Sequence, residues 1–172
     1  STMLSPKMQE ALNDQINAEQ FSAYLYLAMS AYFESEDLKG FANWMRAQVE
    51  EETFHAMKFY GYVHERDGRV LLGAIEAPQS TWESPMAAFV DALAHERLIS
   101  DRINKLVDLA LAESDHATNN FLQWFISEQV EEENSVREIV QKLKRIQGAP
   151  GALYMLDREL AARVYTPPAA GE

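Results

Sequence analysis

One stretch without helical periodicity, residues 67–83, constrains the fold of this chain more than any other feature. It lies between segments whose apolar residues recur at helical spacing, and strand-like alternation is scarce along the whole sequence. Roughly 16 residues without a helix is long for a connection inside a compact domain. It is about the length needed to run along a helical bundle from end to end. The two helices that it joins can therefore be parallel, which predicts a crossover and not a tight hairpin.

The periodicity predicts an all-α fold, a four-helix bundle with one long crossover between the second and third helices and a short fifth helix. The expected ranges are about 6–33, 38–65, 85–113 and 116–147 for the long helices, 152–164 for the fifth helix, and 165–172 for a frayed tail. A length of 172 residues favours a single domain over residues 1–172.

Local residue types indicate where these helices begin and end. Ser5-Pro6 and Ser84-Pro85 each place an N-cap serine before a proline at the first helical position. Asp37 is expected to cap the second helix. Gly68 is expected to adopt the left-handed conformation at the end of that helix, and Gly148 is the stop residue of the fourth.

Composition narrows the classes of partner. The formal net charge of −12 disfavours nucleic acid and suits cations, although acidity alone can also serve solubility. No apolar run approaches the roughly 20 residues that span a bilayer, so no membrane partner is expected. The absence of cysteine excludes disulfides and thiolate metal sites. The first residues show no basic region followed by an apolar core, so a cytoplasmic location is expected.

Ligand-type side chains occupy the apolar face of all four long helices, where the pattern calls for core residues. Glu52 and His55 form a Glu-x-x-His motif on one face of the second helix. Gln129 and Glu132 repeat the three-residue spacing on the fourth helix, and Glu19 shares a face with Tyr26 on the first. The set comprises Glu19, Glu52, His55, Glu96, Gln129 and Glu132.

Such a set indicates a metal site. Any one of these glutamates taken alone is more commonly solvated than a ligand. A core with a buried, unpaired carboxylate from each helix would be unstable, since each costs several kcal/mol or more. Bound cations remove that cost, and carboxylates with one imidazole suit iron, manganese or zinc. A Glu from each of two helices plus Glu-x-x-His from the others is the ligand set of di-iron bundles.

Three segments resemble non-haem ferritins of the bacterial and archaeal type, and the resemblance extends from about Leu4 to Thr166. The segments are residues 13–19 (NDQINAE), 51–57 (EETFHAM) and 120–132 (NFLQWFISEQVEE). The resemblance implies an iron storage protein with ferroxidase activity. Such a protein binds Fe(II) within the bundle, oxidises it with O2, and stores ferric oxide mineral in a hollow shell of 24 subunits.

The resemblance also implies roles for individual residues. Glu19, Glu52 and His55 would hold a first iron, and Glu52 would bridge to a second iron completed by Glu96 with Gln129 close by. Glu132 would lie between the second iron and a third, weaker position. The remaining ligands of that third position would be Glu51, Glu128 and Glu131. Tyr26 and Trp124 resemble aromatic residues that can supply an electron during O2 reduction, and Trp124 is equally compatible with a plain core residue.

Departures from related families refine the expectation. Bacterioferritins carry a second Glu-x-x-His on the fourth helix, where this chain has Glu128 and Glu131. They also place a haem-binding Met directly after the first motif's Glu, where this chain has Thr53, so no haem is expected. Two other functions stay open, namely a carboxylate-bridged di-iron oxygenase subunit and a non-catalytic helical shell protein.

Assembly is also implied only by the resemblance. The partly apolar crossover at residues 70–75 is expected either to form a dimer interface or to pack against its own bundle. The fifth helix would lie near the fourfold axes of the shell. Glu50 and Glu133 would face the cavity or lie on ordinary solvated surface.

Overall fold

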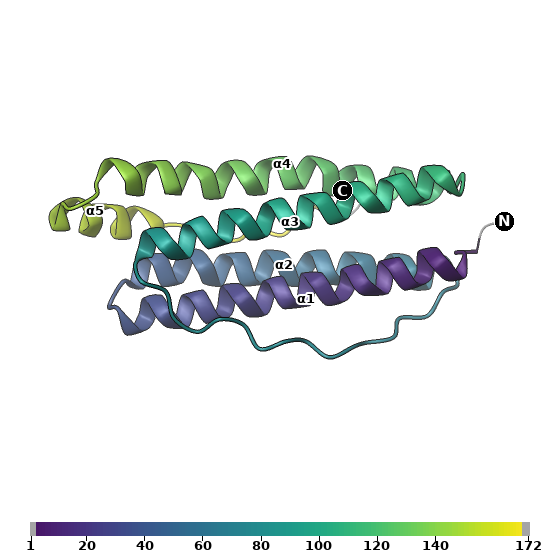
Figure 1. Ribbon diagram of the computed structural model, residues 1–172, viewed down its shortest axis with the longest axis horizontal. Coiled ribbons are helices and arrows are strands. Elements are labelled where there is room, and N and C mark those ends of the chain that lie inside the picture. The colour runs from purple at the N-terminus through teal and green to yellow at the C-terminus, as the bar shows by residue number, and fades with distance from the viewer. Residues whose placement is uncertain (1–2, 170–172) are drawn as a thin grey trace.

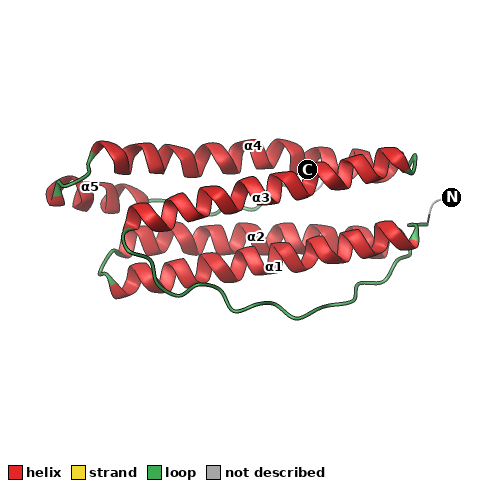
Figure 2. Cartoon of the chain, in the orientation of Figure 1, coloured by secondary structure: helices red, strands yellow, loops and turns green. Residues whose placement is uncertain are grey.

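A computed structural model describes residues 3–169 of the chain, and within that range it contains five α-helices and no strand. The predicted all-α fold is confirmed (Figures 1 and 2). The helices are α1 (Pro6–Ser35), α2 (Lys39–Glu65), α3 (Pro85–Ala112), α4 (His116–Arg145) and α5 (Pro150–Leu160).

The four long helices form the predicted bundle with one crossover. Short turns make α1 antiparallel to α2 and α3 antiparallel to α4 (Figure 1). The crossover returns the chain along the outside of α1, so α2 and α3 run in the same direction (Figure 1). Helix α5 folds back at the far end of α4, and the chain after it runs back toward the middle of the bundle (Figure 1).

The starts of α1 and α3 follow the sequence, whereas the turns between the helices differ from it. The Ser5 and Ser84 hydroxyls accept from the amides of Met8 and Ala87, each at 3.0 Å. The turns after α1, α2 and α3 place Asp37, Asp67 and Ser114 in the left-handed region, with φ between 55° and 58°. The expectation that Asp37 caps α2 and that Gly68 is left-handed was therefore wrong. Asp tolerates the left-handed region, so the residue before Gly68 makes the turn.

The fifth helix begins two residues earlier and ends four residues earlier than expected. Pro150 occupies the start of α5, where a proline needs no amide donor. At the other end the Asn43 amide donates to the carbonyls of Leu160, Ala161 and Arg163 at 3.3, 3.2 and 2.9 Å. Because these carbonyls are satisfied by a side chain, the helix stops at Leu160. The ends of α1 and α4 shift by two residues, to Ser35 and Arg145.

An amide ladder on α1 holds the crossover against the bundle. Gln9, Asn13 and Asn17 lie four residues apart, on one side of the helix. Gln9 Oε1 and Asn13 Oδ1 accept from the amides of Arg69 and Leu71 at 3.0 and 2.9 Å. Asn13 and Asn17 donate to the carbonyls of residues 69 and 74, at 3.0 and 2.9 Å. Four backbone groups of residues 69–74, in a segment without secondary structure, are thereby satisfied.

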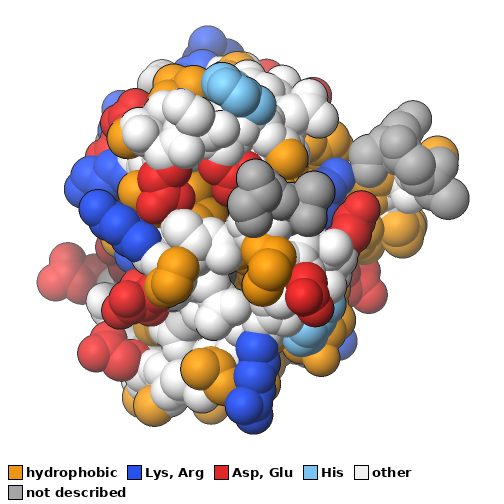
Figure 3. Space-filling model, turned by 90° about the vertical axis from the view of Figure 1, so that its right-hand side faces the viewer, with side chains coloured by type: hydrophobic (Ala, Val, Ile, Leu, Met, Phe, Trp, Pro, Cys, Tyr) orange, Lys and Arg blue, Asp and Glu red, His pale blue; other side chains and the backbone are white. Residues whose placement is uncertain are grey.

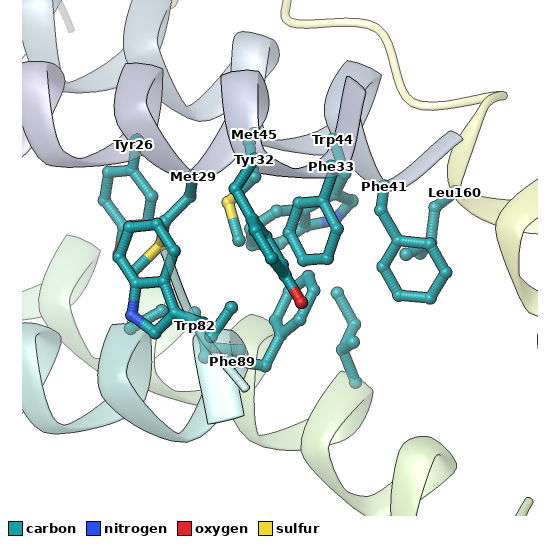
Figure 4. Packing of buried hydrophobic residues seen from close by; sticks show 14 of the residues in the cluster. Tyr26, Met29, Tyr32, Phe33, Phe41, Trp44, Met45, Trp82, Phe89 and Leu160 are labelled. Carbon is teal, nitrogen blue, oxygen red and sulfur yellow. The ribbon is translucent and has the colours of Figure 1, made fainter. Parts of the chain in front are cut away.

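The core consists of two apolar clusters separated by a polar layer. The first apolar cluster lies at the α5 end of the bundle, where Leu160 packs near Phe41 among aromatic and methionine side chains (Figure 4). The second lies toward the opposite end and includes Met8, Phe59, Ile103 and Phe125. The polar layer comprises the buried side chains of Gln15, Glu19, Gln48, Glu52, His55, Glu96, Gln129 and Glu132.

The outer surface shows no single dominant kind of side chain at the end of the bundle where α1 begins and α3 meets α4. Acidic, basic and apolar groups are interspersed there (Figure 3). None of the helices within residues 3–169 is long and apolar enough to cross a membrane.

Candidate metal centre

Each of the four long helices sends a carboxylate into the polar layer. Glu19 and Glu96 are 0% exposed, Glu52 is 1% exposed and Glu132 is 4% exposed. On each helix, the carboxylate lies on the same face as core residues of both apolar clusters. Because that face is buried, the carboxylate is buried with it. All four side chains thus lie on the inward faces of their helices, and their role as ligands stays a prediction.

Three groups of side chains in and beside this layer lie close enough to share a cation. In each group, one ligand atom per residue lies within 4.8 Å of the others. The first group is Glu19, Glu52 and His55, and the second is Glu52, Glu96 and Glu132. The third is Glu51, His55, Glu128 and Glu132. Glu52 belongs to the first two groups, so its carboxylate could contribute an oxygen to each of two neighbouring cation positions.

His55 stands between the first and third groups. Its Nδ1 lies 3.3 Å from Glu52 Oε2 and 3.8 Å from Glu19 Oε2. Its Nε2 lies 3.9 Å from Glu128 Oε2. Glu19 Oε2 and His55 Nε2 are buried and have no hydrogen-bond partner among the described residues. Unsatisfied buried ligand atoms are costly in a plain core, so the donor set fits a bound cation.

The electrostatics of the layer reflect crowded acidic groups. Burial raises the pKa of Glu52 to about 7, against the opposing effect of His55. Burial, with the neighbouring carboxylates second, raises the pKa of Glu96 and Glu132 well above the usual range. Burial alone would lower the pKa of His55, but Glu19 and Glu52 raise it well above its usual value. Without metal, protons therefore stay on groups that would otherwise repel one another.

Tyr26 and Gln129 hold the Glu96 carboxylate from two sides. The Tyr26 hydroxyl donates to Glu96 Oε1 at 2.6 Å. The Gln129 amide donates to Glu96 Oε2 at 3.2 Å, and also faces the Glu96 carbonyl at 3.2 Å and Ser100 Oγ at 3.1 Å. Gln129 is thus a hydrogen-bond donor to a predicted ligand in this structure. Its own ligation of a metal stays a prediction.

Two further glutamines contact the predicted ligands, and the sequence analysis gave them no role. Gln15 Nε2 donates to Glu19 Oε1 at 2.9 Å. Gln48 Nε2 donates to Glu52 Oε1 at 3.0 Å and to Glu132 Oε2 at 2.5 Å. Each glutamine precedes its glutamate by four residues on the same helix, and that spacing could have identified both.

The residues predicted for the third position divide into two sets. Glu51 and Glu128 are half-buried and belong to the third group with His55 and Glu132. Glu131 is exposed and belongs to none of the three groups found among residues 3–169. Glu131 nevertheless stays near the third group, because its charge helps to raise the pKa of Glu128, after the larger effect of burial.

Trp124 lies beside the layer and does not form part of it. The centroids of the Trp124 and His55 rings are 5.5 Å apart, in an edge-on arrangement. Lys58 Nζ lies over the Trp124 ring, 3.6 Å from its centroid. The arrangement places an oxidisable aromatic ring next to a predicted ligand. Its proposed electron-donor role stays a prediction.

Known proteins are similar to this chain in sequence and in fold. A family model described as the ferritin-like domain matches residues 9–146. A bacterial non-heme ferritin of Staphylococcus aureus is 40% identical over 163 residues, which cover 95% of this chain and 98% of that protein. The corresponding Staphylococcus epidermidis protein is 42% identical over the same shares.

Solved structures of ferritins have the same fold as this chain. An open pore ferritin from the hyperthermophilic archaeon Archaeoglobus fulgidus superimposes with a TM-score of 0.93 at 55% identity, covering 94% of this chain and 99% of that one. An engineered closed form of the same archaeal ferritin gives a TM-score of 0.94 at 55% identity, covering 95% and 99%. With matches of this extent in sequence and structure, the chain belongs to the ferritin family.

Proposed function

We propose that this protein stores iron and is a ferroxidase that binds Fe(II) in the polar layer and oxidises it with O2. The ferric product would collect as mineral inside a hollow homo-oligomeric shell. The observation that carries the proposal is that Glu52 belongs to two buried ligand groups at once. A shared carboxylate places two ions close enough to give one electron each to the same O2 molecule.

The geometry supports a division of ligands among three positions. Glu19, Glu52 and His55 would hold one iron, and Glu52, Glu96 and Glu132 would hold the other. The third position would use Glu51 and Glu128 with Glu132, in place of the Glu131 ligand expected from sequence. Because Glu51 and Glu128 are half-buried, this third position lies nearer to solvent and suits a site of transit.

The residues of the layer would act on protons as well as on iron. Metal binding requires deprotonated carboxylates and an unprotonated His55 nitrogen, so Fe(II) binding would release the protons held in the metal-free layer. Carboxylate oxygens are hard ligands that favour Fe(III) over Fe(II) and so assist the loss of an electron. The Tyr26 and Gln129 donors to Glu96 would hold that ligand in place as the ion changes charge.

Assembly is part of the proposal, because one bundle cannot enclose a mineral. Apolar side chains on the crossover point outward, with Leu71, Leu72 and Ile75 exposed by 56%, 75% and 43%. Tyr24 and Leu27 on α1 add exposed apolar surface beside them. Patches of this kind mark protein interfaces. The ferritin relatives support a homo-oligomeric shell. We propose 24 subunits, the number that the resemblance implies, and we expect the shell in the cytoplasm.

The test is iron loading in air. Fe(II) is added to the purified protein at many ions per subunit, ferric absorbance is followed, and size exclusion shows whether iron elutes with the protein. Glu52→Ala should slow oxidation by about 100-fold or more, since loss of even an outer partner of a metal site costs 10–100-fold. Glu50→Ala is the matched control, an exposed neighbour on the same helix.

The outcomes separate the competing functions. A storage ferroxidase takes up many ions per subunit and keeps its shell in the Glu52→Ala variant. A di-iron oxygenase subunit would saturate at two ions per subunit and form no mineral. A non-catalytic shell protein would oxidise iron no faster than the Glu52→Ala variant, and that result would refute the proposal.

A further inference from the structure

The C-terminal segment lies on one stripe of α2 that leads directly to the polar layer. The stripe is defined by the residues Gly40, Asn43, Trp44, Gln48 and Glu51. Gly40, Trp44, Gln48 and Glu51 follow one another at three- or four-residue spacing, and Asn43 lies beside Trp44. Each of them contacts residues 157–163, the end of α5 and the segment after it. Two stripe residues, Gln48 and Glu51, also touch or belong to the ligand groups.

The far end of the stripe fixes the position of α5. Asp157 Oδ1 accepts from the amides of Gly40 and Phe41 at 2.9 and 3.0 Å, and so caps the start of α2. A Cβ at Gly40 would lie 1.6 Å from the Asp157 carbonyl oxygen, so only glycine permits this approach. The Asn43 amide then holds the carbonyls at the end of α5.

The near end of the stripe is organised by Arg163. Its guanidinium donates to the Trp44 carbonyl at 3.0 Å, to Gln48 Oε1 at 2.9 Å and to Glu51 Oε2 at 2.9 Å. It also lies 4.2 Å from the centroid of the Trp44 ring. A planar, permanently charged group with fixed donors is suited to hold several acceptors in one geometry.

The contact with Gln48 sets the direction of its amide. A glutamine side chain can present either its oxygen or its NH2 group to a neighbour. Since Arg163 donates to Oε1, the NH2 group must face the opposite way, toward Glu52 and Glu132. With the amide reversed, an oxygen would face two carboxylates and repel them. The arginine therefore determines whether Gln48 supports or opposes the ligands.

The same arrangement occurs a second time with different residues. Arg102 Nε on α3 donates to Gln15 Oε1 at 3.0 Å, and Gln15 Nε2 donates to Glu19. Arg102 also donates to the Asp14 carbonyl at 3.1 Å. One Arg–Gln–Glu chain joins the segment after α5 to α2, and the other joins α3 to α1. Because the two chains end on different ligands, the arrangement is a repeated feature of this layer.

We propose that Arg163 is a positioning residue for the iron site, acting through Gln48 on Glu52 and Glu132 and directly on Glu51. This inference rests on the proposed function and adds the C-terminal segment to the site. Because Glu51 and Glu132 belong to the third ligand group and Glu52 to the other two, the loss of Arg163 should affect all three positions. We expect Fe(II) to bind about 10–100-fold more weakly.

The experiment measures Fe(II) binding without O2, by calorimetric titration of the assembled protein, and then the dependence of the initial oxidation rate on Fe(II) concentration. Arg163→Ala should weaken binding and raise the half-saturating Fe(II) concentration by about 10–100-fold, with a smaller change in the limiting rate. Arg163→Lys keeps the charge but not the fork of donors, and should recover only part of the affinity. Exposed Arg158 on α5 provides the matched control, Arg158→Ala, with unchanged binding.

A double-mutant cycle distinguishes positioning from simple loosening of α5. Gln48→Met removes the amide at similar volume. If Arg163 acts mainly through Gln48, then Arg163→Ala should add little to the loss already caused by Gln48→Met. Full additivity would overturn the relay. Wild-type affinity in Arg163→Ala would overturn the proposal while leaving the ferroxidase function intact, whereas a wild-type protein that binds no Fe(II) would overturn both.

Discussion

The polar layer and the two apolar clusters that flank it are built by the same four helices but are held together in opposite ways. In the first apolar cluster, Phe89 touches the rings of Phe33, Phe41 and Trp44 at centroid distances of 5.4–5.8 Å. That packing is stabilising without any ligand. In the polar layer, buried carboxylates are kept together by protons and glutamine amides. The clusters therefore provide the stability of the metal-free bundle, and the layer provides a site at some cost to it.

The largest effect should come from breaking an apolar cluster. Phe89→Ala removes a fully buried ring and should lower the free energy of unfolding by about 3–5 kcal/mol. The loss should be similar with and without Zn²⁺, because Phe89 does not belong to the ligand groups. Denaturant unfolding of metal-free and Zn²⁺-loaded protein measures both values. The neighbouring exposed Val90→Ala is the control, with a change within about 0.5 kcal/mol.

The polar layer, unlike the apolar clusters, should make the stability of the metal-free protein depend on pH. Burial raises the pKa of Glu52 to about 7 in the folded state, above its usual 4.5. The resulting stability is fully present below pH 4.5 and is lost as pH rises through 7. For metal-free protein, we expect this group to lower the free energy of unfolding on the order of 3 kcal/mol between pH 4.5 and 8. Denaturant unfolding across that range measures the slope.

Two variants of this experiment sharpen the comparison. Glu96→Gln removes one of the carboxylates that raise the pKa of Glu132, so the pH slope of the metal-free variant should be flatter. Saturating Zn²⁺ should reverse the slope in wild-type protein, because metal binds the deprotonated ligands. A metal-free protein whose stability rose steadily from pH 5 to 8 would show that the layer is not strained by its carboxylates.

The smallest effect should come from a position outside both regions. Asp37 has a φ of 58° in the turn between α1 and α2, a conformation that glycine adopts without a Cβ penalty. Asp37→Gly should raise the free energy of unfolding by about 0.5–1 kcal/mol, equally in metal-free and Zn²⁺-loaded protein. Thermal melting in both states checks this. A gain that appeared only with Zn²⁺ would mean that the turn is coupled to the polar layer.

These contrasts also explain which parts of the structure could be predicted from sequence. Helical spacing has a fixed geometry, so it identified the four long helices and placed Glu19, Glu52, His55 and Glu96 on inward faces. The contacts of Gln15 and Gln48 follow from the same spacing. A neutral amide on an inward face costs less to bury than a carboxylate, so it is a weaker sign of a metal site than a buried glutamate. The contact of Arg163 with Gln48 joins residues 115 positions apart, and no local pattern encodes it.

The left-handed turn residue after α2 and the end of α5 could not be predicted from local sequence either. A left-handed turn needs one permissive residue, and local sequence offered both Asp67 and Gly68. The end of α5 depends on Asn43, which lies on a helix far away in the chain. In both cases several local conformations differ little in energy, so packing decides among them.

The amide ladder on α1 has a consequence for association between subunits. Because Gln9, Asn13 and Asn17 bind backbone groups of residues 69–74 within one chain, that part of the crossover is held in place before any partner arrives. The conformational entropy of that segment is lost when the chain folds. Association with a second subunit therefore does not have to include the free-energy cost of ordering it. Leu71 and Leu72 lie exposed on that stretch and Ile75 follows it directly, so a second subunit could dock on these side chains with little prior ordering of the backbone.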